Sequence, residues 1–85
     1  MRDLGTLREK ETRRFTLELG KEVVSVVPDC GCTVGTVEGD RVYLDITPGK
    51  VPFGMNEYVM RREVKVVYAD MTRESVNLTA VVKKS

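Results

Sequence analysis

The sequence contains no histidine and no tryptophan, and only two of its 85 residues are alanine. Without histidine, the commonest general acid or base and the commonest neutral metal ligand are both missing. The scarcity of alanine removes the strongest helix former. Neither sign of charge dominates, because 14 lysines and arginines stand against 13 acidic residues. We therefore expect no electric field that would steer the protein toward nucleic acid or anionic lipid.

Long hydrophobic runs are also missing. No stretch approaches the roughly 20 apolar residues of a membrane span, and no apolar segment of signal-peptide length follows the charged start of the chain. We expect no membrane association and synthesis in the cytoplasm. In that reducing compartment the two cysteines are expected to remain thiols. The chain is too short for two independent cores, so residues 1–85 are predicted to form one domain.

Valine dominates the apolar residues, with 15 copies. Its branched side chain suits a pleated sheet. Apolar residues alternate with period two, as in half-buried strands, over residues 15–19, 42–46, 63–68 and 76–82. Another strand is expected over residues 3–8, and one over residues 23–27, central because both of its faces are apolar. Residues 34–42 predict a hairpin in which Gly39 takes a positive φ.

The strand pattern predicts the fold class. Six or seven short strands without a helix indicate an all-β fold, and specifically an immunoglobulin-like two-sheet β-sandwich of about seven short strands. A small closed barrel is the alternative. A domain of this size buries only roughly 60% of the surface that its unfolded chain exposes, so we expect it to gain stability from a partner.

Cys30-Gly31-Cys32 is the local motif that invites a chemical interpretation. Two thiolates can bind a soft metal such as zinc or Cu(I). A closed zinc site needs about four ligands, however, and the chain has no further cysteine. The spacing also differs from the C-x-x-C of redox proteins. We favour two small packed side chains at a tight turn, with no metal and no cofactor. The alternative is a thiol or metal site completed in an oligomer.

A longer loop between residues 48 and 58 is unusually apolar. Two interpretations stay open: the loop caps the sandwich, or it is exposed and binds a partner. In the second case the partner-binding residues are Val51, Pro52, Phe53 and Met55.

Two arginine pairs, at residues 13–14 and 61–62, raise the possibility of a basic stripe. Glutamates are interspersed with them at positions 11, 18 and 63. Opposite charges on neighbouring strands form cross-strand pairs. We therefore predict cross-strand ion pairs on a solvated face rather than a basic stripe.

Four short motifs follow one another along the chain: Asp3-Leu4-Gly5-Thr6-Leu7, Phe15-Thr16-Leu17, Asp29-Cys30-Gly31-Cys32-Thr33 and Ile46-Thr47-Pro48-Gly49. This succession resembles the DUF1573 family of bacterial immunoglobulin-like domains, which are related to the ASPM/SPD-2/Hydin modules. The resemblance covers nearly the whole chain and implies a seven-stranded sandwich without catalysis. The chain departs from the family in its shortened turn at residues 20–22, in the added loop at residues 51–57, and in lacking the usual export signal.

No combination of residues supports catalysis, so we predict that the protein is not an enzyme. Sandwich domains bind proteins through edge strands and end loops. We predict a structural, protein-interaction module, with protein partners or a homo-oligomer and no nucleic acid. A small accessory protein of a bacteriophage virion, decorating a capsid or joining tail components, would gain stability from burial in the assembly. The alternative is a cytosolic thiol or metal-binding module that uses Cys30 and Cys32 in an oligomer.

Overall fold

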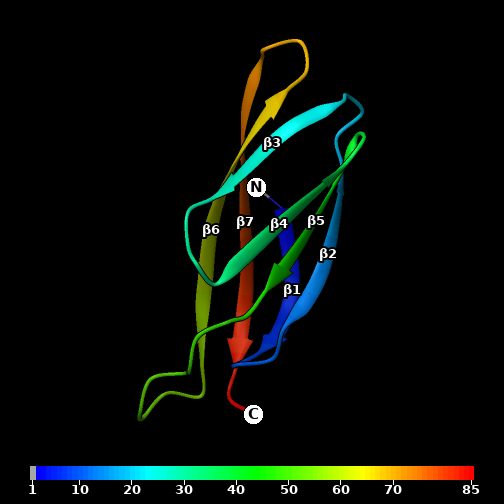
Figure 1. The fold of residues 1–85 in the computed structure, drawn as a ribbon. Coiled ribbons are helices and arrows are strands. Elements are labelled where there is room, and N and C mark those ends of the chain that lie inside the picture. The colour runs from blue at the N-terminus through cyan, green and yellow to red at the C-terminus, as the bar shows by residue number, and fades with distance from the viewer. Residues whose placement is uncertain (1) are drawn as a thin grey trace.

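The computed structural model describes residues 2–85, and over this range it contains seven strands and no helix. The strands are β1 (Arg2–Arg8), β2 (Arg13–Glu18), β3 (Val23–Pro28), β4 (Thr33–Glu38), β5 (Arg41–Ile46), β6 (Glu57–Tyr68) and β7 (Arg73–Lys83). The all-β prediction is confirmed. Strands β6 and β7, with 12 and 11 residues, are longer than expected. Their hairpin runs along the molecule, which measures 47 by 20 by 17 Å (Figure 1).

The strands form two sheets, with the orders β1-β7-β6-β3 and β2-β5-β4 (Figure 1). The presence of two separate sheets confirms the predicted sandwich and rules out the closed barrel. The second, fifth and fourth strands share one sheet while the third, sixth and seventh share the other, which is the grouping found in immunoglobulin sandwiches. Strand β1 joins the larger sheet by pairing parallel to β7, whereas the other neighbours are antiparallel.

The core lies between the sheets and is built from alternate residues of the strands. On β5, the side chains of Val42, Leu44 and Ile46 are fully buried, and the residues between them are partly exposed. On β6 and β7 the same alternation buries Val64, Val66, Val76, Leu78, Ala80 and Val82. Each such side chain contributes roughly 1.5–3 kcal/mol when it leaves water. The period-two pattern therefore predicted the inward faces of these strands correctly.

The predicted hairpin of residues 34–42 is present as β4 and β5. Glu38 pairs with Arg41, so the turn has two residues. Its first residue, Gly39, has a φ of 60°, and this is the position that type II′ hairpin turns give to glycine. A second glycine serves a different purpose: a Cβ added to Gly35 would lie 2.7 Å from a methyl carbon of Val26. Glycine thus lets β4 approach β3 where the two sheets meet.

Strand β3 lies at the edge of the larger sheet, so the prediction of a central strand is wrong. Its pairing with β6 shifts register between Val23 and Ser25. Val26 packs against the core, but Val24 and Val27 keep 63% and 57% of their surface exposed. Valine favours extended backbone whether or not a second strand covers it. Apolar residues on both faces therefore do not reveal how many neighbours a strand has.

Cross-strand ion pairs occur on the outer face of the smaller sheet, as predicted, but the acidic and basic partners differ. Arg14 on β2 bonds to Asp45 on β5 at 2.9 Å, and Arg41 lies 3.3 Å from Glu18. The Arg14 guanidinium lowers the pKa of the Asp45 carboxyl by donating hydrogen bonds to it. The two arginines of β6 belong to the other sheet, so they do not continue this charged face.

Candidate functional site

The loop of residues 47–56 projects from the end of the molecule that holds the C-terminus (Figure 1). Its base belongs to the core, because Val51 is only 2% exposed. Beyond Val51 the chain leaves the core, and Pro52, Phe53 and Met55 are exposed. Phe53 is 105% exposed, more than in a reference peptide. Val51 is buried, so its prediction as a partner-binding residue is wrong, whereas Pro52, Phe53 and Met55 are exposed, as the second interpretation requires. Binding of a partner by these residues stays a prediction. We call Pro52, Phe53 and Met55 the apolar tip.

The side chain of Glu9 holds the base of this loop. Its carboxylate accepts a hydrogen bond from the backbone N–H of Val51 and lies 3.4 Å from the backbone nitrogen and hydroxyl of Ser85. Glu9 is 8% exposed, and these hydrogen bonds lower the pKa of its carboxyl. One buried carboxylate thus connects the end of β1, the loop and the C-terminus.

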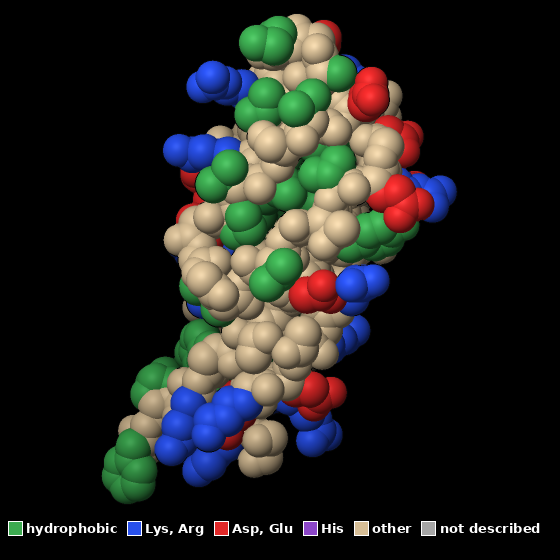
Figure 2. Space-filling view, in the orientation of Figure 1, with side chains coloured by type: hydrophobic (Ala, Val, Ile, Leu, Met, Phe, Trp, Pro, Cys, Tyr) green, Lys and Arg blue, Asp and Glu red, His purple; other side chains and the backbone are tan. Residues whose placement is uncertain are grey.

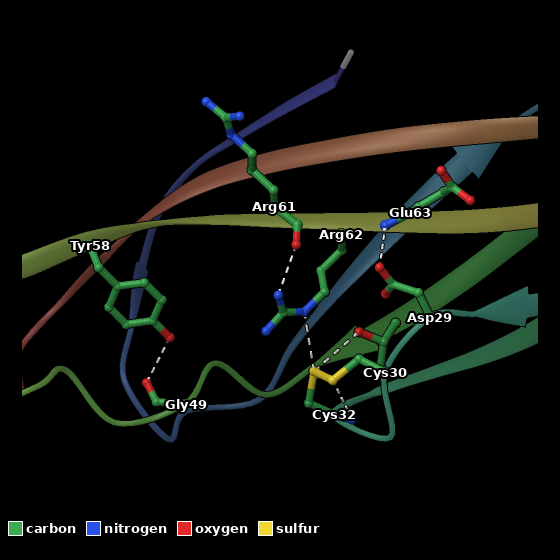
Figure 3. The surroundings of a disulfide bond; sticks show 9 residues. Asp29, Cys30, Cys32, Gly49, Tyr58, Arg61, Arg62 and Glu63 are labelled. Carbon is green, nitrogen blue, oxygen red and sulfur yellow. Dashed lines mark hydrogen bonds between the residues drawn. A yellow bond between two sulfur atoms is a disulfide. The ribbon is translucent and has the colours of Figure 1, made fainter.

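Further hydrogen bonds order the loop on either side of the apolar tip. The Tyr58 hydroxyl donates to the carbonyl of Gly49 at 2.9 Å (Figure 3). The backbone N–H of Met55 donates to the carbonyl of Pro52 at 3.0 Å, which closes a turn in which Gly54 takes a φ of 86°. The exposed Phe53 therefore stands on a loop that is held at its base and closed at its end.

Replacing Glu9 tests this anchor. We expect Glu9→Gln to lower the free energy of unfolding at neutral pH, because the carboxylate that accepts from Val51 N–H loses its charge. The carboxyl pKa is lower in the folded protein than its ordinary value of 4.5. Its stabilising contribution is therefore complete above pH 4.5 and is lost as the pH falls through the folded-state pKa.

Urea unfolding of both proteins between pH 3 and pH 7 measures this difference. The difference in the free energy of unfolding between wild type and Glu9→Gln should become smaller as the solution is acidified. Glu11→Gln is the matched control, since it removes an equal charge from an exposed side chain two residues away. A gap that stays constant with pH would contradict a role for the Glu9 charge.

Four exposed lysines surround the base of the apolar tip: Lys10, Lys50, Lys83 and Lys84. The backbone N–H of Lys84 donates to the Asn56 carbonyl at 3.0 Å, and that of Lys10 donates to the Pro48 carbonyl at 2.8 Å. Figure 2 shows basic side chains gathered beside the protruding hydrophobic end. Glu9 is turned inward, while Glu11 and Glu57 are exposed at this end, Glu57 directly opposite Lys83. The exposed lysines outnumber these two glutamates, so this end of the surface combines apolar side chains with an excess of positive charge.

The Cys30-Gly31-Cys32 turn connects β3 in one sheet to β4 in the other. The structure joins the two cysteines in a disulfide, so the expectation of free thiols is wrong. Their Cα atoms lie 5.2 Å apart, inside the range of about 4.4–6.8 Å that disulfides require. Ahead of the turn, the Asp29 carboxylate accepts a hydrogen bond from the backbone N–H of Glu63 at 3.0 Å, which attaches the turn to β6.

Both cysteine side chains are partly buried, and a cation lies against one of them. The guanidinium Nε of Arg62 donates to Cys32 Sγ at 3.3 Å, and its Nη1 donates to the Arg61 carbonyl at 2.8 Å (Figure 3). The backbone N–H of Cys32 donates to Cys30 Sγ at 3.2 Å. The Arg62 contact bridges 30 positions of sequence, so no local motif could have predicted it.

Comparisons of the chain with protein-family models, with curated proteins and with solved structures return no match. The DUF1573 resemblance stays a prediction. Among the described residues, no group of three or more His, Cys, Asp and Glu side chains could hold a metal ion. Over residues 2–85 there is also no helix with the length and apolar character of a membrane span.

Proposed function

We propose that this protein is a non-enzymatic interaction module that docks a partner protein through its apolar tip. The observation that carries the proposal is the full exposure of Phe53 on an anchored loop. An aromatic side chain that moves from water into a pocket contributes roughly 1.5–3 kcal/mol. A loop that is already ordered loses less conformational entropy on binding. Aromatic residues also dominate the energetics of protein interfaces.

The charge around the apolar tip indicates the chemistry of the partner. Lys50 belongs to the loop, and Lys10, Lys83 and Lys84 lie at its base, where they outnumber the exposed Glu11 and Glu57. Charged groups at the rim of an interface are arranged to meet opposite charge. The partner surface is therefore an apolar pocket with an acidic rim.

The setting that we propose is a bacteriophage virion, in which the protein decorates a capsid or joins tail components. Two observations support it. The molecule is elongated and presents its apolar tip at one end of the long axis (Figure 1). A domain of 85 residues also gains stability from burial against a larger assembly.

Photo-crosslinking in the source organism tests the docking surface. A benzophenone amino acid in place of Phe53 should form a covalent adduct with one discrete protein of the assembly. The same amino acid in place of Met71 is the matched control. Met71 is 81% exposed on the β6–β7 turn, at the opposite end of the molecule. Mass spectrometry of the adduct identifies the captured chain.

An adduct from position 53 and none from position 71, with a virion protein that carries an acidic, apolar pocket, is the expected result. Adducts with lipid would indicate that the apolar tip binds a membrane rather than a protein, which would overturn the proposal. Recovery of only free monomer from the source, or equal adducts from both positions, would also overturn it.

A further inference from the structure

We infer that Cys30 and Cys32 form a thiol–disulfide exchange site that oxidises a pair of thiols on a partner protein. The proposal goes beyond docking and uses a different part of the surface. It rests on three features of the β3–β4 turn: the disulfide itself, the cation against one of its sulfurs, and the open space over the turn.

The position of Arg62 distinguishes the two sulfur atoms. Its guanidinium donates to Cys32 Sγ, and the Thr33 hydroxyl lies 3.8 Å from the same sulfur. When the disulfide opens, a thiolate on Cys32 would keep both partners, and a neighbouring cation stabilises a thiolate. Thiolates that are better stabilised also leave faster in disulfide exchange. Cys30 Sγ accepts a hydrogen bond from an uncharged donor, the backbone N–H of Cys32, whereas the donor to Cys32 Sγ is a cation. Cys32 is therefore the better leaving group, and Cys30 is the sulfur that is attacked.

The exchange proceeds in two balanced steps. A thiolate of the partner attacks Cys30 Sγ, forms a mixed disulfide with it, and displaces Cys32 as a thiolate beside Arg62. The second thiolate of the partner then attacks the partner's own sulfur in that mixed disulfide and displaces Cys30. The partner dithiol loses two electrons and two protons and becomes a disulfide. The Cys30–Cys32 disulfide gains the two electrons, and its thiolates take protons from solvent according to pH.

A thiol has room to reach this turn. Gly31 is exposed, and a Cβ built on it meets no heavy atom within 4 Å. Cys30 and Cys32 are themselves partly exposed. A thiol can therefore approach the disulfide while the protein stays folded, as exchange requires.

Equilibration of the folded protein with reduced and oxidised glutathione tests the inference. Acid quenching, alkylation and intact mass measurement give the fraction of dithiol at each ratio. We expect reversible opening in the native protein, monitored by circular dichroism. Arg62→Met should move the equilibrium toward the disulfide by about tenfold, because it removes a charge-assisted hydrogen bond to the thiolate. The fraction of dithiol in Arg62→Lys should lie between those of the wild type and Arg62→Met, since lysine keeps the positive charge.

Arg61→Met is the matched control. It removes the same charge from the preceding residue of β6, whose side chain points away from the disulfide (Figure 3). The inference would be overturned if the disulfide opened only in denaturant. It would also be overturned if Arg61→Met and Arg62→Met had the same equilibrium between disulfide and dithiol. Phe53→Ser should exchange like the wild type, so a failure of the docking proposal would not affect this result.

Discussion

Phe53→Ser is expected to release the protein from its assembly without unfolding it. The aromatic ring is fully exposed in the isolated chain, so its removal should change the free energy of unfolding by less than about 0.5 kcal/mol. In the docked state that we propose, the same ring fills a pocket of the partner. Truncating such an interface residue costs about 2 kcal/mol or more, which corresponds to about a 30-fold loss of affinity.

The fraction of the protein that sediments with particles from the source measures this effect. Met71→Ser is the control, because it removes another exposed apolar side chain from the opposite end of the molecule. Lys84→Glu should also weaken association, and its effect should fall as salt is added, since ions screen charges at the rim. Full co-sedimentation of Phe53→Ser would show that the apolar tip is not the docking surface.

Leu44→Ala is expected to remove a large part of the stability of the fold. Leu44 is fully buried on β5, the middle strand of the smaller sheet, where it lies between Phe15 on β2 and Gly35 on β4. Replacing a buried leucine by alanine costs about 3–5 kcal/mol, and more where the cavity cannot collapse. Gly35 has no side chain that could move into the space. A chain of this length has a total stability of only about 4–13 kcal/mol.

Urea unfolding monitored by circular dichroism gives the free energy of unfolding of both proteins. Val34→Ala, at an exposed position of β4, is the matched control and should cost less than about 1 kcal/mol. Comparable losses for the two variants would mean that Leu44 does not occupy the packed centre of the sandwich.

The sequence alone was sufficient for the strand faces and the hairpin. Val42, Leu44 and Ile46 alternate with polar neighbours, and all three are buried. Gly39 takes the positive φ that the pattern predicted, in a turn that the structure shows to have two residues. These features depend on neighbours two to four positions away, because side chains of an extended strand point alternately to opposite faces. The burial of every second residue can therefore be predicted from the sequence without knowing which strands pair.

For the candidate sites, the sequence identified the apolar loop but did not show which of its residues are buried and which are exposed. Val51 and Phe53 are both large apolar residues two positions apart, yet one is buried and the other fully exposed. Val51 packs in the core, and its backbone N–H bonds to Glu9, which lies 42 positions earlier in the sequence. The same holds for the disulfide: the C-x-C spacing was visible, but Arg62 approaches it from another strand.

Sequence by itself determined that this chain forms strands, which faces of them are apolar and where a tight turn falls. Tertiary structure decided that β1 pairs with β7, that β3 is an edge strand, and that Arg62 lies against Cys32. The physical reason is the range of the interactions. Backbone preferences and side-chain alternation act over a few residues, whereas strand pairing and side-chain contacts depend on closing long loops and filling one shared core.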